Sequence, residues 1–189
     1  MKCHRLSTRF VAVIAAAILS IPCQTFAGTI VDTGPGDSIT AGAALYPGGP
    51  QRLAGKFSVT SATTINSVEG WIGQHNLNST GSLTISVGLS QDIALFSGTI
   101  STPQLGRIAA QWTGLTGLNW SLAAGDYWVT FAGNGGFDGF MPYGAPNPLI
   151  HYSYNNSAAG WFDEPSLDFG VRITGIVAPS NAIVSIAVE

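Results

Sequence analysis

Charge is scarce in this chain of 189 residues, because Asp, Glu, Lys and Arg make up only 9% of it, against about 25% in typical soluble domains. Beyond the first 27 positions the only Lys and Arg residues are Arg52, Lys56, Arg107 and Arg172, and they are scattered. Nucleic acids and anionic lipids bind clustered positive charge, since affinity comes from counterions released at several contacts. We expect neither as a partner.

Cysteine is rare too, and its position defines the start of the chain. Both cysteines, Cys3 and Cys23, fall in a stretch with a basic start, an apolar run over 10–19 and the small-residue site Thr25-Phe26-Ala27. This is the pattern of a secretory signal peptide. The apolar run is about half the length of a membrane-spanning helix, and Pro22 fits poorly with lipid attachment at the neighbouring cysteine. We predict cleavage after residue 27.

The remaining domain, 28–189, is predicted to be secreted and free of thiols, with no membrane span. Retention at the cell surface or in the periplasm stays open. Disulfides commonly stabilise secreted domains, whereas about 160 residues can hold together by their core alone. The leader contains three of the seven Lys and Arg residues and none of the ten Asp and Glu residues, so its removal takes the formal net charge from −3 to −6.

Helical periodicity is absent after the leader, whereas alternation of apolar and polar residues with period two recurs, most clearly from Leu83 to Leu89. About nine strands are expected, at 29–32, 57–59, 64–72, 83–89, 93–100, 108–113, 127–131, 149–154 and 169–173. Two packed sheets would cover the apolar faces that one open sheet leaves bare. The sequence predicts one all-β domain, an antiparallel two-sheet sandwich of jelly-roll type, with a closed barrel as the alternative.

Two stretches, 34–50 and 133–148, are rich in turn residues and are expected to be loops. The second also contains Phe137, Phe140 and Tyr143. Loops of this length inside a compact domain are uncommon and often functional. We therefore place the candidate site in and after this stretch.

Several strand and turn motifs resemble those of a known group of exported proteins. They lie at Thr29–Gly36, Leu53–Phe57, Trp71–Gly73, Leu118–Val129, Met141–Pro142, Ala145–Leu149 and Leu167–Ile173. Together they are similar to the exported domains of bacterial PEP-CTERM proteins. The resemblance implies a β-sandwich at the cell envelope, with a role in the matrix or in a biofilm.

The family's C-terminal sorting segment is not intact in this sequence. PEP-CTERM proteins typically end in a Pro-Glu-Pro motif, a spanning helix and a basic tail. Residues 177–189 contain no intact motif of this kind, too few apolar residues to span a bilayer and no basic residue. We expect release into the medium or the matrix, with these residues forming a last strand.

Catalytic motifs are also missing, and we expect no enzymatic activity. Gly-x-Ser-x-Gly does not occur. The carboxylates of a glycosidase converge across about 5–9 Å, whereas the neighbours Asp163 and Glu164 would point to opposite sides of a strand, so a solvated turn is favoured. His75 and His151 have no second His or Cys at metal-ligand spacing, which argues against a zinc site.

Calcium is harder to exclude, because extracellular sandwich domains often bind it through loop oxygens. The candidate ligands are Asp138, Asn155, Asn156 and Asp163. Their spacing follows no regular calcium motif, so ordinary polar turns are favoured. We predict no cofactor and no metal.

Carbohydrate binding is the most specific function that the residues suggest, because aromatic rings stack on sugars while nearby Asp and Asn bond the hydroxyls. The candidate ligand-binding residues are Phe137, Asp138, Tyr143, Asn155, Trp161 and Asp163. Alternatively, these aromatic residues close one end of the sandwich.

Three functions are therefore considered. The first is a secreted, non-enzymatic structural or interaction module whose partner is an extracellular polysaccharide or matrix protein. The second is a lectin-like carbohydrate binder that uses 133–165, and the third is a polysaccharide-acting enzyme. A binder needs exposed aromatic rings beside a groove, and an enzyme needs two convergent carboxylates in a cleft.

Overall fold

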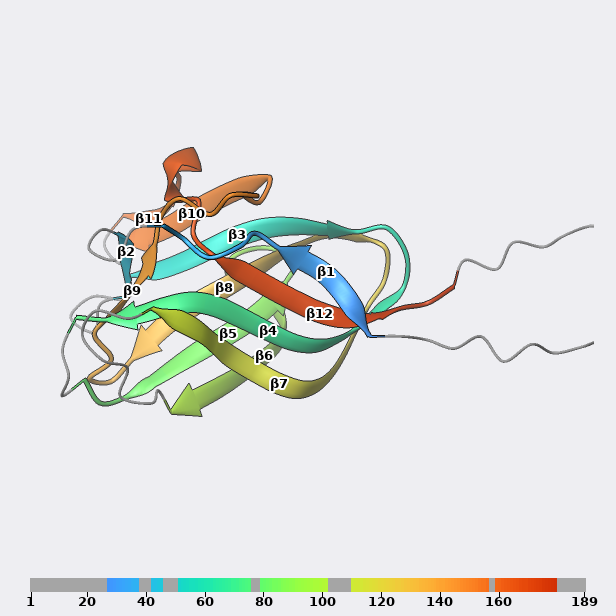
Figure 1. Ribbon diagram of the computed structural model, residues 1–189, viewed down its shortest axis with the longest axis horizontal. Coiled ribbons are helices and arrows are strands. Elements are labelled where there is room, and N and C mark those ends of the chain that lie inside the picture. The colour runs from blue at the N-terminus through green and yellow to red at the C-terminus, as the bar shows by residue number, and fades with distance from the viewer. Residues whose placement is uncertain are drawn as a thin grey trace, which may run out of the picture.

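The computed structural model describes residues 27–37, 42–45, 51–75, 79–101, 110–156 and 159–179 (Figure 1). These residues form two antiparallel sheets of six strands each and one short 3-10 turn, η1 (Pro165–Leu167). Within these ranges no helix is long and apolar enough to cross a membrane. The predicted all-β, two-sheet sandwich is confirmed, whereas most of the predicted signal peptide and the end of the predicted last strand lie outside the described residues.

The two sheets are built from strands that are far apart in the sequence. The first has the order β1 (Gly28–Asp32), β12 (Val171–Val177), β4 (Thr63–Gln74), β9 (Gly139–Pro142) and β2 (Gly42–Leu45), with β7 (Gln111–Leu122) also paired to β4. The second has the order β11 (Gly160–Asp163), β10 (His151–Asn156), β3 (Arg52–Val59), β8 (Gly125–Asn134), β5 (Ser82–Gly88) and β6 (Ala94–Ser101). Successive strands mostly belong to different sheets, which gives the fold its jelly-roll character.

The core lies between the sheets and is filled by the alternate residues of the predicted strands. From the second sheet Leu83, Ile85 and Val87 point inward, and from the first sheet Ile65 and Val68 meet them; all five are fully buried. Strands buried on one face produce this alternation, which is why the sequence shows it.

One residue of the clearest strand lies on the opposite side from the prediction. Leu89, expected to face the core, is 59% exposed. The register between β5 and β6 shifts after Val87, and the Leu89 amide donates to the Ile93 carbonyl in the hairpin loop. The extra residue of the bulge is Leu95 in β6, and β5 itself ends at Gly88. Leu89 therefore lies in the turn, where the alternation of a strand no longer decides which way a side chain points.

The described ranges contain twelve strands, whereas about nine were expected for the whole domain. The additional strands β2, β9 and β11 have four residues each, too few to show a recognisable period. Two of them lie in the stretches that were predicted to be loops, β2 within 34–50 and β9 within 133–148. The predicted strand at 108–113 also continues to Leu122, past a bulge at Gly117, which has a φ of 68°.

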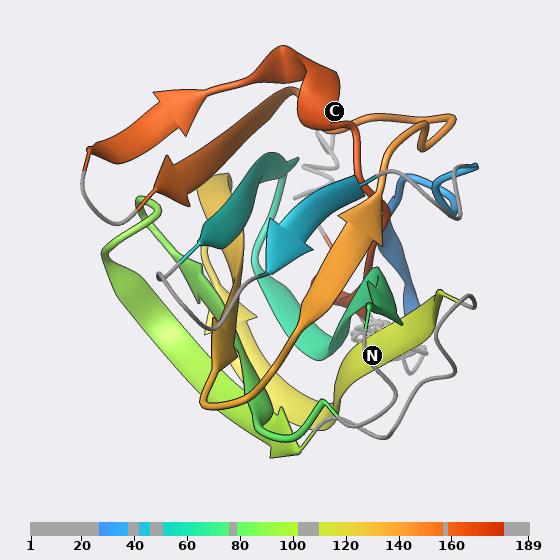
Figure 2. The same ribbon diagram turned by 90° about the vertical axis from the view of Figure 1, so that its left-hand side faces the viewer.

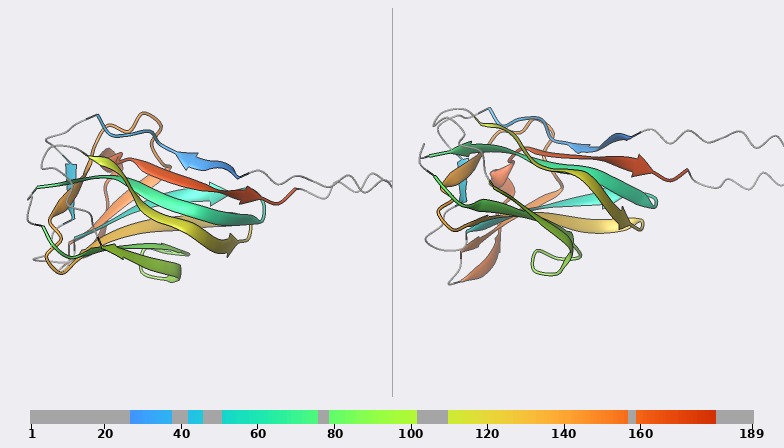
Figure 3. Two further views of the ribbon diagram at one scale, coloured as in Figure 1. Left: turned by 60° about the horizontal axis from the view of Figure 1, so that its bottom comes forward. Right: turned by 90° about the horizontal axis from the view of Figure 1, so that it is seen from below.

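One end of the sandwich is closed by short elements. β2 pairs with β9, which in turn pairs with the last two residues of β4. The β10–β11 hairpin lies along the top of this end in Figure 2, with the β2–β9 pair below it. The start of β1 and the end of β12 lie side by side at the opposite end (Figure 3). The β2–β9 pair and the β10–β11 hairpin therefore form the rim of the sandwich at this end.

Candidate functional site

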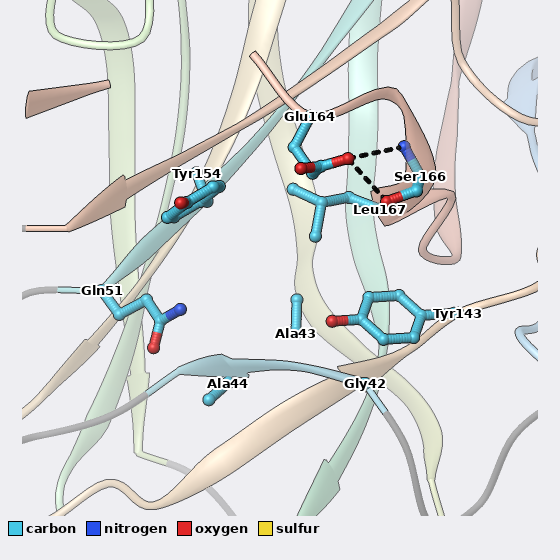
Figure 4. Close-up of a pocket in the computed structure, with 9 residues that line it drawn as sticks. All are labelled: Gly42, Ala43, Ala44, Gln51, Tyr143, Tyr154, Glu164, Ser166 and Leu167. Carbon is cyan, nitrogen blue, oxygen red and sulfur yellow. Dashed lines mark hydrogen bonds between the residues drawn. The ribbon is translucent and has the colours of Figure 1, made fainter. Parts of the chain in front are cut away.

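A hollow of about 450 Å³ lies at this rim, between β2 and the segment that runs from β10 to η1 (Figure 4). It is lined by Gly42, Ala43, Ala44, Gln51, Tyr143, Tyr154, Glu164, Ser166 and Leu167. Ala43 and Leu167 are buried and form an apolar floor, whereas the two tyrosines, the glutamine and the glutamate are half-buried. The hollow thus combines an apolar base with polar walls.

Small residues on β2 leave the space open. Ala43 and Ala44 have no side chain long enough to fill it. Gly42 lies so close to β9 that an added Cβ would sit 2.5 Å from the Met141 carbonyl oxygen, so a larger residue would displace the strand. The pairing of β2 with β9 also places Tyr143, the residue directly after β9, on the edge of the hollow.

Tyr143 directs its hydroxyl into the hollow (Figure 4). Among the described residues this hydroxyl has no hydrogen-bond partner. Burial raises the pKa of Tyr143, and the negative charges of Glu164 and Asp168 raise it further. The hydroxyl therefore stays protonated at neutral pH and can both donate and accept a hydrogen bond.

Glu164 is held in place at the start of η1. Its Oε1 accepts hydrogen bonds from the Ser166 hydroxyl at 2.6 Å and from the Ser166 amide at 3.4 Å. Its own amide donates to the Tyr152 carbonyl at 3.0 Å, which ties it to β10. The second carboxylate oxygen, Oε2, accepts no hydrogen bond from the described part of the chain.

Tyr154 and Gln51 form the other wall. The Tyr154 ring is stacked on Phe162 with the centroids 5.3 Å apart, which fixes its tilt. Figure 4 shows the Tyr143 ring face on and the Tyr154 ring edge on. The two rings are therefore walls of a hollow rather than one flat platform.

Two residues of the predicted carbohydrate site are buried elsewhere. Phe137 has no exposed surface, and Asn155 is 6% exposed. Phe137 packs so tightly beside Gly133 and Gly139 that a Cβ on either glycine would clash with its ring. Neither residue can contact a ligand at the surface of this structure.

Asp138 and Trp161 are nearer the surface but do not line the hollow. Asp138 Oδ1 lies 3.2 Å from Nδ1 of His75. Trp161 lies under the guanidinium of Arg52, 4.9 Å from the ring centroid, and its indole nitrogen donates to Asp92. Both residues join segments that are distant in sequence.

Asp163 lies on the outer side of the β10–β11 hairpin. Its Oδ1 accepts a 2.9 Å hydrogen bond from the Ser153 hydroxyl and lies 2.9 Å from Nε2 of His151. These contacts, that of His151 first, lower the pKa of Asp163. The Ser153 hydroxyl donates to the carboxylate and not to the histidine, so these residues do not form the relay that activates a serine nucleophile.

Sequence reasoning identified Tyr143 but missed most of the hollow. The sequence predicts a solvated turn for Glu164 and gives no sign of a ligand-binding role for Gln51, Tyr154 or Ser166. Asp163 ends β11, whereas Glu164 begins η1, and the two neighbouring carboxylates have different partners. No local pattern connects β2 with η1, because β2 belongs to the first sheet and η1 follows β11 of the second, so only the packing of the two sheets brings them together.

Metal ligands do not gather in the described ranges, which contain no group of three or more His, Cys, Asp or Glu side chains that could hold an ion. The candidate calcium ligands Asp138 and Asp163 each have a histidine partner instead. No family model matches this sequence, and no curated protein does. Membership of the PEP-CTERM group stays a prediction from the motifs.

Proposed function

We propose that this protein is a secreted, non-enzymatic interaction module that binds a carbohydrate in the end hollow, in an extracellular matrix or at a cell surface. The observation that carries the proposal is the hydroxyl of Tyr143, which no group in the described part of the chain bonds. It is directed into a hollow that also holds a carboxylate and a second tyrosine. Secretion and the matrix setting rest on the signal-peptide pattern and on the PEP-CTERM resemblance.

The chemistry of the hollow suits a sugar. Its volume of about 450 Å³ falls within the range of about 300–1,000 Å³ typical of small-molecule sites. Tyrosine rings offer apolar surface to the C–H face of a sugar ring. The Tyr143 hydroxyl, the Gln51 amide and Oε2 of Glu164 have no hydrogen-bond partner among the described residues. They can therefore bond sugar hydroxyls, which supply both donors and acceptors.

The carboxylates support binding over hydrolysis. Glycoside hydrolysis usually needs two carboxyl groups, one on either side of the scissile bond. Of the lining residues that the structure describes, Glu164 alone carries a carboxylate. Asp163, its neighbour, bonds to His151 and Ser153 on the other side of the hairpin.

A glycan array probed with residues 28–189 tests the proposal, followed by titration of the best ligand. Tyr143→Phe removes the hydroxyl and keeps the ring, and we expect it to weaken binding about fivefold. Tyr127→Phe is the matched control, because that hydroxyl donates to the Ala123 carbonyl away from the hollow. An array with no signal, or equal losses in the two variants, would contradict the proposal.

A further inference from the structure

We propose that the sugar bound in the hollow carries a free, protonated amino group. This inference rests on the proposed function and adds the class of ligand. Among the described residues of the lining, Glu164 is the one that carries a charge, and with Asp168 it acts on the Tyr143 hydroxyl as a negative charge. The hollow is therefore electronegative.

No cation from the described part of the domain neutralises it. Arg52 follows Gln51 directly, but its guanidinium turns away to Asp92, at 2.8 Å. Lys56 pairs with Asp126 at 2.9 Å, and Arg172 pairs with Asp32 at 3.2 Å. Only Arg107, the fourth such residue after the leader, lies outside the described ranges. A half-buried carboxylate without a counter-charge favours a cationic ligand.

The groups around Glu164 match an ammonium. Such a group has three donors and no acceptor. Oε2 of Glu164 is available to accept one of these hydrogen bonds, because the Ser166 contacts occupy Oε1. The hydroxyl of Tyr143 and the amide oxygen of Gln51 are further acceptors in the same lining, and the tyrosine rings attract a cation through their π faces. An anionic sugar would be repelled.

The same hollow favours an amino sugar over a lysine side chain. A lysine stem is apolar and would leave the hydroxyl of Tyr143, the amide of Gln51 and the hydroxyl of Ser166 without new partners. The hydroxyls of an amino sugar can reach such groups. The predicted net charge of −6 for residues 28–189 would also draw a polymer of amino sugars toward the protein.

The test compares the affinity of residues 28–189 for four probes: β-1,4-linked tetramers of glucosamine, N-acetylglucosamine and glucose, and a lysine-containing tetrapeptide. We expect the glucosamine tetramer to bind about tenfold more tightly than the neutral tetramers, because a hydrogen bond between charged groups is stronger than a neutral one. Glu164→Gln should remove this preference and keep weak binding of the neutral sugars.

Glu69→Gln is the matched control, since it makes the same chemical change on β4 of the first sheet, outside the hollow. It should keep the preference. Equal binding of the neutral and amino tetramers would overturn this inference and leave the proposed function standing. If the lysine-containing peptide binds as tightly as the glucosamine tetramer, the claim that the amino group of the ligand belongs to a sugar would be overturned. If neither these tetramers nor any glycan of the array binds, the proposed function itself fails.

Discussion

The indole nitrogen of Trp161 donates a 2.9 Å hydrogen bond to the carboxylate of Asp92, which joins β11 to the loop between β5 and β6. Arg52 completes the contact, because it lies over the indole ring and pairs with the same aspartate. The three residues come from segments that are not adjacent along the chain. This arrangement assigns Trp161 a structural role, although the sequence suggested a ligand-binding one.

Trp161→Ala should therefore destabilise the fold without weakening carbohydrate binding. Loss of the ring and its hydrogen bond is expected to lower the free energy of unfolding by about 1–2 kcal/mol. Urea unfolding measures the first effect, and titration with the array ligand measures the second. If Trp161→Ala folds but binds the ligand much more weakly, the structural role would be contradicted and Trp161 would belong to the binding site.

Phe137→Ala should have a larger effect on stability. The ring is fully buried and packs against Gly133 and Gly139, so its removal leaves a cavity. We expect a loss of about 3–5 kcal/mol in the free energy of unfolding. Phe137→Leu, which keeps most of the apolar volume, should lose clearly less, and equal losses in the two variants would contradict the packing described here.

Tyr152 should make the fold sensitive to alkali. Its buried hydroxyl donates to the Phe169 carbonyl and accepts from the Leu149 amide, and burial raises its pKa to about 12. A tyrosine with a raised pKa stabilises the fold below the pKa of the unfolded group, about 10, and loses this contribution as the pH rises toward 12.

Tyr152→Phe should accordingly lose stability at neutral pH, by about 1–3 kcal/mol, because the Leu149 amide is left unpaired. The difference from the wild type should shrink as the pH rises from about 10 to 12. Unfolding in urea at a series of pH values measures it. A difference that stays constant over this range would contradict the account of the buried hydroxyl.

Asp163 should make the fold sensitive to acid. Hydrogen bonds from His151 and Ser153 lower its pKa, so the carboxylate stabilises the fold above its unfolded pKa of about 3.9, and this contribution is lost as the pH falls through the lower native pKa. Asp163→Asn should be less stable than the wild type at neutral pH, and the two should converge as the pH falls through the lowered native pKa of Asp163. Ser153→Ala should also be less stable than the wild type at neutral pH, by a smaller amount. A stability difference between Asp163→Asn and the wild type that persists in acid would contradict this role of the carboxylate.

Most of the fold was predictable from the sequence, because a strand that is buried on one face has alternating apolar and polar residues. The alternation in β5 and β8 is read directly from Ile85 and Val129, which are both fully buried. Strands of four residues, such as β2, are too short to show this alternation. Their position in the sheet depends on pairing with strands that are distant in sequence.

The site was harder to predict for the same reason. Tyr143 was found because it belongs to an aromatic, turn-rich segment. Glu164 and Tyr154 join it only when β2, β10 and η1 fold onto one rim, and the small size of Ala43 matters only because other elements surround it. Trp161 and Asp163 fit a carbohydrate site by residue type, but their partners on neighbouring strands hold them on the outer side of the hairpin.

A crystal structure of residues 28–189 with the best array ligand tests the central claim most directly. We predict density for a sugar in the hollow, in contact with the hydroxyl of Tyr143 and the carboxylate of Glu164. A sugar bound instead beside Trp161, or elsewhere on the outer faces of the sheets with the hollow empty, would contradict the account.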